Sequence, residues 1–466
     1  MPGVKAQYSG LFCLDELPQP ENTGRIRAFH SSLGKLLPYL FYTLLIWLLL
    51  PFSLLRLLWK SRQSPEYRHR WRERLAWYPR LEPPAARPRV IFHAVSVGEV
   101  HAVQPLIDAF MAAHPDYAVM ITTSTPTGSE RVHALFGERV EHVYLPWDLE
   151  SAVMRFLQRF KPELLVLLET ELWPNLVRGC QRSGCKVVLA NARLSSKSLK
   201  AYKRFGELMA STLQGLQWIA AQSAGDARNF LLLGMPDERL CITGSLKFDV
   251  VLSSGQLERA CELRHSWPQR PVWIAASTRE GEDAKVLEAC RLVLAGLPDA
   301  LLILVPRHPE RFTAADHQAR AGGLQVQRFS SAEPLADDTR VLLGDTMGDM
   351  ALYYGLADVA FVGGSLVPTG CQNLIEPASL GLPVLAGPSL FNFRRVSELL
   401  QEAGGMHVVA DVPGLAKAVV RLLQDSELRE QMGMAARQEV LRNQGAAQRQ
   451  LALLEDCLGQ SSSQAG

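Results

Sequence analysis

Residues 89–114 read RVIFHAVSVGEVHAVQPLIDAFMAAH, and this stretch decides the fold class of the chain. It begins with an apolar run, 89–95, which is typical of a strand that is buried on both faces. In the segment that follows, Val100, Ile107 and Phe110 recur at helical spacing and fall on one face. The stretch therefore predicts a β-strand followed by an α-helix, which is the repeating unit of α/β proteins.

The same rhythm continues along the chain in two series. The first series reaches about Leu246 and adds the runs 117–123, 140–146, 163–169, 185–192 and 216–222. The second series consists of the runs 272–277, 300–306, 324–330, 340–345, 359–364 and 382–387. Strands that alternate with helices favour parallel sheets covered on both sides. We therefore expect an α/β protein with two doubly wound, Rossmann-like domains facing a cleft, with ligands at the carboxyl ends of the strands.

The length and the changes in composition predict how the chain is divided. A chain of 466 residues is too long for one compact core. The predicted parts are an N-terminal extension (1–35), a membrane anchor (36–60), a first Rossmann-like domain (61–250), a linker with helical character (251–270), a second Rossmann-like domain (271–425) and a helical tail (426–466). We expect the tail to pack back on the first domain.

The anchor is predicted from residues 36–55, which read LLPYLFYTLLIWLLLPFSLL and carry no charge. A helix of about 20 apolar residues is long enough to cross a bilayer. Seven basic residues follow it within 56–74, more than precede it, so we expect a single pass with the large C-terminal body on the cytoplasmic side. Two alternatives remain for this segment, a helix that lies in the membrane interface and a buried core helix.

Composition excludes some classes of protein. The chain has 49 basic and 47 acidic residues, a formal net charge of +2, so nothing global indicates a nucleic-acid partner. Its eight cysteines are scattered, and no pair has CxxC spacing. We therefore expect reduced thiols and no metal site.

Acidic residues follow two strands of the first series. Glu99 stands in the sequence Ser96-Val97-Gly98-Glu99, where a carboxylate at the mouth of the cleft is placed to take a proton from a hydroxyl group. Ser-x-x-Glu is also a capping box, in which Glu99 only satisfies backbone N–H groups. Glu171 belongs to the cluster 169–171, which either faces the cleft or marks a helix N-terminus.

A basic run follows the strand 185–192. It contains Arg193 and Lys197 and continues to Arg204. On a nearly neutral protein, such a local patch suits a phosphorylated acceptor. The alternative is a solvated helix face, which is the usual meaning of a charge run.

The second series carries groups that suit an anion and a nucleotide. Hydroxyl groups, free N–H groups and a guanidinium meet at a helix start, which favours a phosphate or a carboxylate, although Ser277 can also be only a cap. A carboxylate at a helix start after a glycine-rich turn can bind the two hydroxyls of a ribose; the alternative for Glu376 is an acid that the helix dipole stabilises. The residues singled out in this half are Ser277, Thr278, Arg279, Arg307, Gly344, Thr346, Asn373 and Glu376.

Ten segments, in this order, resemble the 3-deoxy-D-manno-octulosonic acid (Kdo) transferases of lipopolysaccharide synthesis, glycosyltransferase family 30. They are SVGEVHAVQPLI, TTSTPTGSERV, LLETELWPNL, LANARLSSKS, GSLKFD, STREGED, LVPRHPERF, LLGDTMGDM, GGSLV and EPASLGLPVLAGPSLFNF. The resemblance runs from about residue 36 to past residue 425.

The resemblance implies a GT-B fold and a reaction. Kdo would pass from CMP-Kdo, with inversion and without a metal or cofactor, to a lipid A precursor (lipid IVA) at the bacterial inner membrane. Glu99 would be the general base, and Glu171, Arg193 and Lys197 would lie on the acceptor side of the cleft. The donor contacts would be Ser277, Thr278 and Arg279, with CMP at Arg307, Gly344, Thr346, Asn373 and Glu376. Arg279, Arg193 and Lys247 are equal candidates for the carboxylate of Kdo.

The chain departs from the family pattern after GGSLV. Cys371 and Gln372 stand where a glycine and a histidine are usual, and glutamine can donate hydrogen bonds but cannot become a cation. Two other functions remain as alternatives, another membrane-associated GT-B nucleotide-sugar transferase and a non-catalytic, membrane-tethered nucleotide-sugar binder. An epimerase would need no anchor, which argues against that class.

Overall fold

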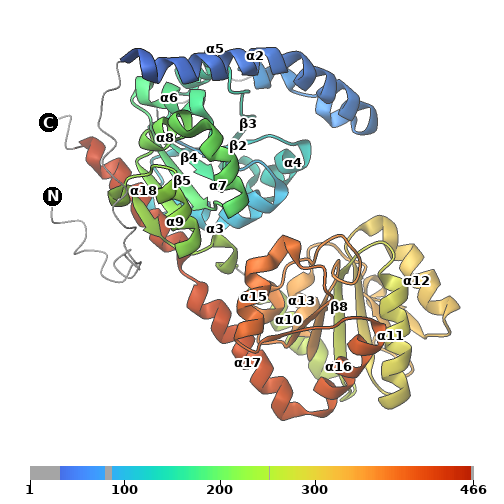
Figure 1. The fold of residues 1–466 in the computed structure, drawn as a ribbon. Helices are drawn as coiled ribbons and strands as arrows, with labels where there is room; N and C mark the ends of the chain where they lie inside the picture. Colours follow the sequence, from blue (N-terminus) through green and yellow to red (C-terminus); the bar gives the residue numbers. More distant parts are fainter. Residues whose placement is uncertain (1–31, 79–86, 251, 463–466) are drawn as a thin grey trace. The chain divides into compact units, whose positions relative to one another are not determined.

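The computed structural model describes residues 32–78, 87–250 and 252–462 (Figure 1). Most of the predicted N-terminal extension, up to residue 31, lies outside these residues. The chain forms two compact units. The first contains the residues up to Asp249 together with those from Gly445 on, and the second is Val250–Gln444.

The first unit is built on a parallel sheet of seven strands with the order β3-β2-β1-β4-β5-β6-β7. Its strands are β1 (Arg89–His93), β2 (Ala118–Thr123), β3 (Glu141–Tyr144), β4 (Leu164–Leu168), β5 (Lys186–Ala192), β6 (Trp218–Ala221) and β7 (Leu240–Ile242). The direction of winding reverses between β1 and β4, which pair in parallel. The reversal leaves a crevice beyond the carboxyl ends of these two strands.

Helices cover both faces of this sheet. They are α3 (Val97–Ala113), α4 (Pro126–Phe136), α5 (Glu150–Phe160), α6 (Pro174–Ser183), α7 (Ser196–Tyr202), α8 (Gly206–Gln214), α9 (Ala224–Leu232) and α18 (Ala446–Ser462), with the short 3-10 turn η5 (Lys203–Phe205) between α7 and α8. Successive residues of β1 enter opposite cores, Ile91 one cluster and Val90 and Phe92 the other. The continuous apolar run 89–95 reflects this double burial.

The second unit repeats the plan, and its sheet has the order β10-β11-β9-β8-β12-β13-β14. The strands are β8 (Val272–Thr278), β9 (Leu301–Pro306), β10 (Val326–Arg328), β11 (Val341–Leu343), β12 (Val359–Val362), β13 (Val384–Ala386) and β14 (Met406–Val408). The helices are α10 (Ser254–Ser266), α11 (Asp283–Gly296), α12 (Phe312–Ala321), α13 (Met350–Gly355), α14 (Ile375–Ser379), α15 (Arg394–Glu402), α16 (Val412–Gln424) and α17 (Ser426–Asn443). Here the winding reverses between β8 and β12.

Two segments are placed differently from the predicted divisions. The stretch predicted as a linker, 251–270, contains α10, whose buried Ala260 would lie 2.8 Å from a Cβ added at Gly355 of α13. That stretch is therefore part of the second unit. The predicted tail, 426–466, is divided, because α17 belongs to the second unit and α18 to the first.

Where the chain returns to the first unit, its backbone is hydrogen-bonded to Asp249. The Asp249 carboxylate accepts hydrogen bonds from the backbone N–H groups of Gly445 and Ala447, both at 2.6 Å. Further along α18, the Gln450 side chain accepts from the N–H of Asn191 at 3.0 Å and donates to Thr243 Oγ1 at 3.0 Å. The last helix therefore packs back on the first unit and binds the carboxyl end of β5 and the residue that follows β7.

The apolar segment forms the long helix α2 (Ser32–Gln63), and one side of its first half is bound to the first unit. Tyr42 donates to the buried carboxylate of Asp148 at 3.0 Å, and Thr43 donates to Asn175 at 3.2 Å. The N–H of Asn175 also donates to Asp148, at 2.9 Å. Ile46 and Leu50 of α2 pack against the core of the unit. This half of α2 lies along the protein surface, next to α6 and α8.

The other side of α2 is apolar and exposed. Leu44, Leu48 and Phe52 each expose about two thirds of their surface, and residues 38–62 are long and apolar enough to cross a membrane by length and composition. Packing limits that interpretation. From Tyr39 to Leu50, about 17 Å of helix lies against the unit, more than half of a hydrocarbon core of about 30 Å.

Candidate active site

Glu99 lies at the N-terminus of α3, just beyond the carboxyl end of β1, and forms the predicted capping box. Its carboxylate accepts a hydrogen bond from the N–H of Val95 at 2.9 Å and one from Ser96 Oγ at 3.0 Å. The Glu99 N–H in turn donates to Ser96 Oγ. The capping interpretation is therefore correct in geometry. It does not exclude chemistry, because the carboxylate stays partly exposed at the sheet edge.

The surroundings of Glu99 raise the pKa of its carboxyl group. Burial raises its pKa to about 7, against the opposing hydrogen bonds from Val95 and Ser96. The negative charges of Glu169 and Glu171 raise it as well. These acids follow β4, so the strands on the two sides of the reversal bring the carboxylates together. At neutral pH, a carboxyl group with a pKa near 7 is unprotonated in about half of the molecules and is a stronger base than an ordinary carboxylate.

Glu171 has two aromatic neighbours that fix its position. Trp173 Nε1 donates to Glu171 Oε2 at 2.9 Å, and His93 Nε2 lies 3.9 Å from the same oxygen. Burial raises the pKa of Glu171 and lowers the pKa of His93 to about 4, so the imidazole is neutral. His93 Nε2 is buried and has no hydrogen-bond partner among the described residues. The sequence interpretation missed His93, whose only signal was a histidine ending a buried strand.

Two residues at the carboxyl ends of β4 and β5 have strained backbone. Glu169 and Asn191 have φ values of 52° and 48°, in the left-handed region that side chains other than glycine rarely adopt. The Asn191 side chain holds the N–H of Leu246 at 3.1 Å, and Lys247 lies 3.8 Å from Glu169. The loops after β4, β5 and β7 are thus bound to one another.

Arg193 and Lys197 have exposed side chains, and among the residues that the structure describes neither forms an ion pair with the carboxylate cluster. The backbone of Arg193 does contact it, since the Arg193 N–H donates to the carbonyl of Glu169 at 3.2 Å. Lys197 is on α7, one turn farther from the strand. Both cations therefore lie at the entrance to the edge and are available to an anion in solvent.

In the second unit, the residues after β8 and β12 are bound by a carboxylate that sequence reasoning did not select. The fully buried Glu282 accepts hydrogen bonds from the N–H groups of Arg279 at 3.1 Å, Ser365 at 3.0 Å and Leu366 at 2.9 Å, and from that of Gly364. In the sequence, nothing distinguishes Glu282 from the other polar residues of the loop STREGED. Its role is to fix the two loops on either side of the reversal.

Ser277 and Thr278 end β8 inside this arrangement. Ser277 has a φ of 57°, and Thr278 is fully buried. A Cβ added at Gly363 would lie 2.7 Å from Thr278 Cα, so only glycine allows the loop after β12 to pass so close to β8. Arg279 projects from the same turn, and its Nη1 lies 2.7 Å from His308 Nε2.

Arg307, Asn373 and Glu376 come together at the neighbouring strand ends. Asn373 Nδ2 donates to Glu376 Oε1 at 2.9 Å, and Asn373 Oδ1 accepts from the N–H of Ile375 at 3.0 Å. Burial raises the pKa of Glu376, while the Asn373 hydrogen bond and the charge of Arg307 lower it. A carboxylate and an amide held side by side suit the two hydroxyls of a ribose.

Gly344 and Thr346 were predicted to contact CMP, and in the structure both contact other side chains of the second unit. A Cβ at Gly344 would lie 2.8 Å from Val305 Cγ2 and 2.9 Å from Tyr353 Cζ, so this glycine is needed for packing. Thr346 Oγ1 lies 2.6 Å from the hydroxyl of Tyr353. Both residues lie at the carboxyl end of β11, beside the loops already described.

The two residues that depart from the family pattern differ in exposure. Cys371 is fully buried, and its N–H donates to the carbonyl of Ser389 at 2.8 Å. Gln372 is partly exposed, and its side chain donates to the carbonyl of Gly370 at 3.3 Å. At this position the family usually has a histidine. In this chain the Gln372 amide contacts the glycine-rich loop instead.

The two edges offer complementary chemistry. The first collects carboxylates around Glu99, and the second collects cations, free N–H groups and the Asn373–Glu376 pair. Within residues 32–78, 87–250 and 252–462, no group of three or more His, Cys, Asp and Glu side chains is placed to hold a metal ion. The first edge can take up a proton, and the second can bind an anionic nucleotide derivative.

Comparison with known proteins gives consistent results. Residues 69–250 match the family described as 3-deoxy-D-manno-octulosonic-acid transferase. A 3-deoxy-D-manno-octulosonic acid transferase of Haemophilus influenzae is 41% identical over 421 residues, which cover 90% of this chain and 98% of that protein. One of Bordetella pertussis is 39% identical and covers 82% and 90%.

A solved structure supports the fold. The UDP-GlcNAc 2-epimerase of Neisseria meningitidis is 16% identical, covers 80% of this chain and 100% of its own, and has a TM-score of 0.53. This likeness concerns architecture only, and together with the two parallel sheets it identifies a GT-B fold. The identity over nearly the whole chain decides the family: the protein belongs to the 3-deoxy-D-manno-octulosonic acid transferases, which are glycosyltransferases.

Proposed function

We propose that this protein transfers Kdo from CMP-Kdo to a lipid A precursor, lipid IVA, with inversion at the anomeric carbon. The observation that carries the proposal is Glu99, whose pKa is raised to about 7 at the point where the first sheet reverses. Membership in the Kdo transferase family supplies the sugar. The nucleotide and the lipid acceptor follow from the motifs that the chain shares with that family.

Glu99 acts as the general base in this proposal. Its carboxylate takes the proton of an acceptor hydroxyl, and the hydroxyl oxygen forms the new bond to the anomeric carbon of Kdo. The bond between that carbon and the phosphate oxygen of CMP breaks, and CMP leaves with the electron pair. Because CMP is a good leaving group, no general acid is required. Attack from the side opposite CMP gives inversion.

The second unit holds the donor. Asn373 and Glu376 bind the ribose hydroxyls of CMP, and Arg307, which lies close enough to affect the pKa of Glu376, offsets the phosphate charge. Ser277, Thr278 and Arg279 contact the sugar-phosphate part. Gly344 and Thr346 shape the neighbouring wall of the nucleotide site. Arg279 is the cation best placed in this unit for the carboxylate of Kdo.

An enzyme with a lipid substrate must be attached to the membrane. We infer that α2 attaches this protein to the cytoplasmic face of the inner membrane. The hydrogen bonds of Tyr42 and Thr43 to Asp148 and Asn175 favour a helix that lies in the plane of the leaflet over the predicted single crossing. After Leu50, only about 20 Å of helix remains, and it contains Lys60 and Arg62. The exposed apolar side then faces hydrocarbon, and the basic residues that follow face lipid headgroups.

Glu99→Gln tests the base. We expect kcat to fall about 10²- to 10⁴-fold, since the amide keeps the shape of the cap but takes up no proton. Product mass after incubation with CMP-Kdo and lipid IVA measures transfer, and titration with CMP measures donor affinity, which should not change. Asp425→Asn, which alters the cap of α17, is the control. Normal turnover in Glu99→Gln would remove Glu99 from the mechanism.

The pH profile gives a second test. Glu99 must be unprotonated to act, so kcat/KM should rise with pH up to about 7 and then level off. Glu169→Gln removes a negative charge that raises the pKa of Glu99, and the half-maximal pH should move lower. Glu163→Gln, at the opposite end of β4, should leave the profile unchanged. A profile that is the same in the wild type and Glu169→Gln contradicts the coupling.

Glu376→Ala tests the nucleotide site. Losing hydrogen bonds to a charged group should weaken CMP binding about 10- to 100-fold, measured by calorimetry. Glu288→Ala, on the exposed side of α11, is the matched control. An unchanged dissociation constant for CMP would exclude Glu376 from the site.

Labelling of the natural cysteines tests whether α2 lies in one leaflet or crosses the membrane. If α2 lies in one leaflet, Cys13 and the exposed Cys261 are on the same side of the membrane. A membrane-impermeant maleimide should label neither in intact spheroplasts and both after lysis. Variants Cys13→Ser and Cys261→Ser identify each signal. Labelling of Cys13 in intact spheroplasts would instead establish the predicted single pass.

A further inference from the structure

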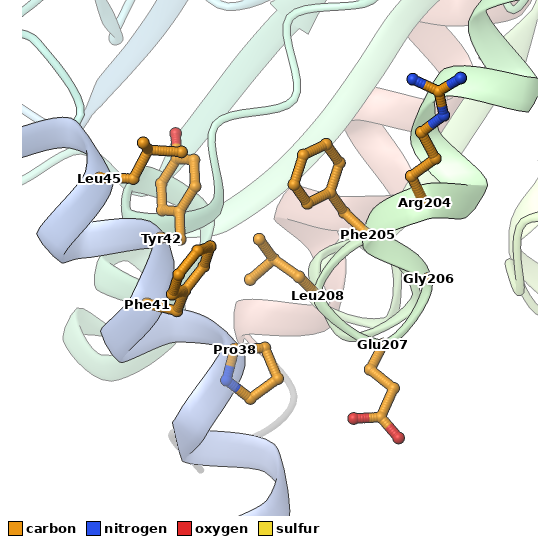
Figure 2. A pocket seen from close by; sticks show the side chains of 9 residues that line it. All are labelled: Pro38, Phe41, Tyr42, Leu45, Arg204, Phe205, Gly206, Glu207 and Leu208. Atoms are coloured by element: carbon orange, nitrogen blue, oxygen red, sulfur yellow. The ribbon is translucent and has the colours of Figure 1, made fainter. Parts of the chain in front are cut away.

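A hollow of about 400 Å³ lies in the first unit between the first half of α2 and the turn from η5 into α8. Phe41 and Leu45 of α2 form one wall, and Phe205 and Leu208 form the other. Figure 2 shows the Phe205 and Leu208 side chains directed toward α2, and those of Arg204 and Glu207 directed away from it. The inner walls of the hollow are apolar, and the charged residues Arg204 and Glu207 lie at its border.

The walls of the hollow are not covered by the protein. Phe41 exposes 65% of its surface and Phe205 exposes 51%. Such apolar surface is unfavourable in water and favourable against hydrocarbon. An apolar cavity of roughly 150 Å³ holds a benzene-sized ring, so this hollow has room for a considerably longer hydrocarbon segment. It opens beside the exposed face of α2, the side from which a lipid chain would enter.

Charged side chains border the hollow at η5 and the start of α8. Arg204 and Glu207 belong to its lining, and the exposed Lys197, Lys200 and Lys203, earlier in the same segment, give residues 192–207 a net positive charge. Cations in this position suit a phosphate at the membrane surface. The combination of a hydrocarbon-sized hollow with a neighbouring cationic rim matches a lipid that carries phosphate close to its acyl chains.

The hollow is also connected to the catalytic edge. Tyr202 immediately precedes η5, and burial together with the charge of Glu171 raises the pKa of its hydroxyl. Tyr202 therefore lies near the Glu171 carboxylate, and Phe205 follows it by three residues. On the other side, Trp173 binds Glu171, and Asn175, two residues later, binds Thr43 of α2. Both walls of the hollow are attached to the segment that positions Glu171.

We propose that this hollow binds one acyl chain of the phosphorylated lipid acceptor while a phosphate of that acceptor lies at the cationic rim. The proposal rests on the proposed function and deepens it. It makes the enzyme select acylated over deacylated acceptor by direct binding, in addition to concentrating both partners at one membrane. The sugar of the same molecule then reaches the carboxylates of the first unit.

Kinetics with two acceptors test the proposal. Leu45→Trp fills the hollow, and Phe205→Ser removes one apolar wall at a half-exposed position. Each should raise KM for the acylated acceptor about tenfold, with kcat and CMP affinity unchanged. Neither should alter transfer to the deacylated, phosphorylated disaccharide. Leu48→Trp and Phe52→Ser, on the exposed side of α2, are matched controls that perturb membrane contact without reaching the hollow.

Three outcomes would overturn the proposal. The first is an unchanged KM in both variants, and the second is an equal rise in the controls, which would assign the effect to general membrane contact. The third is an equal loss with the deacylated acceptor, which would place the damage at the catalytic edge. By contrast, failure of the wild type to transfer Kdo to either acceptor would contradict the proposed function itself.

A binding experiment separates the hollow from catalysis. With Phe205 replaced by p-benzoylphenylalanine, irradiation should crosslink the protein to the acyl chain of lipid IVA in the presence of excess phospholipid. The same replacement at Phe52 should crosslink phospholipid. Crosslinking of phospholipid alone from position 205 would show that a bulk lipid occupies the hollow and would reject the acceptor as its ligand.

Discussion

Both units depend on one constraint: a parallel sheet brings the carboxyl end of every strand to the same edge. Where the winding reverses, the loops after the two central strands separate, and the helices that follow present free N–H groups there. In the first unit these loops carry Glu99 and Glu171, and in the second they carry Ser277 and Gly363. The loops of the second unit also present N–H groups, and the buried Glu282 carboxylate binds four of them.

Central strands could be predicted from the sequence because burial on both faces produces long apolar runs. The edge strands Leu240–Ile242 and Met406–Val408 were missed, since each has three residues of which only the first is buried, and this leaves no such run. Glu282 was missed for another reason. Its partners at 364–366 lie about 80 residues later in the chain, so nothing near STREGED indicates that this acid, and not Glu280, is buried.

For Glu99, the local sequence allowed two interpretations, a helix cap and a base, and the structure shows that they are compatible. Val95 and Ser96 make it a cap, while burial and the charges of Glu169 and Glu171, about 70 residues later, raise its pKa. The apolar segment 36–55 is similar. Its composition predicts affinity for hydrocarbon, but the direction in which the helix runs depends on Asp148, which no local pattern connects to it.

The return of α18 to the first unit has a consequence for the order of assembly. Asn191, near the carboxyl end of β5, is held by Gln450, and one face of the first sheet is completed by Leu451 and Leu454. During synthesis the second unit is therefore complete before the first can close. A ribosome that stops before α18 releases a chain whose second unit is complete and whose first unit is not. The hydrogen bonds and apolar contacts that α18 makes with the first sheet therefore form last, although most of that sheet is synthesised first.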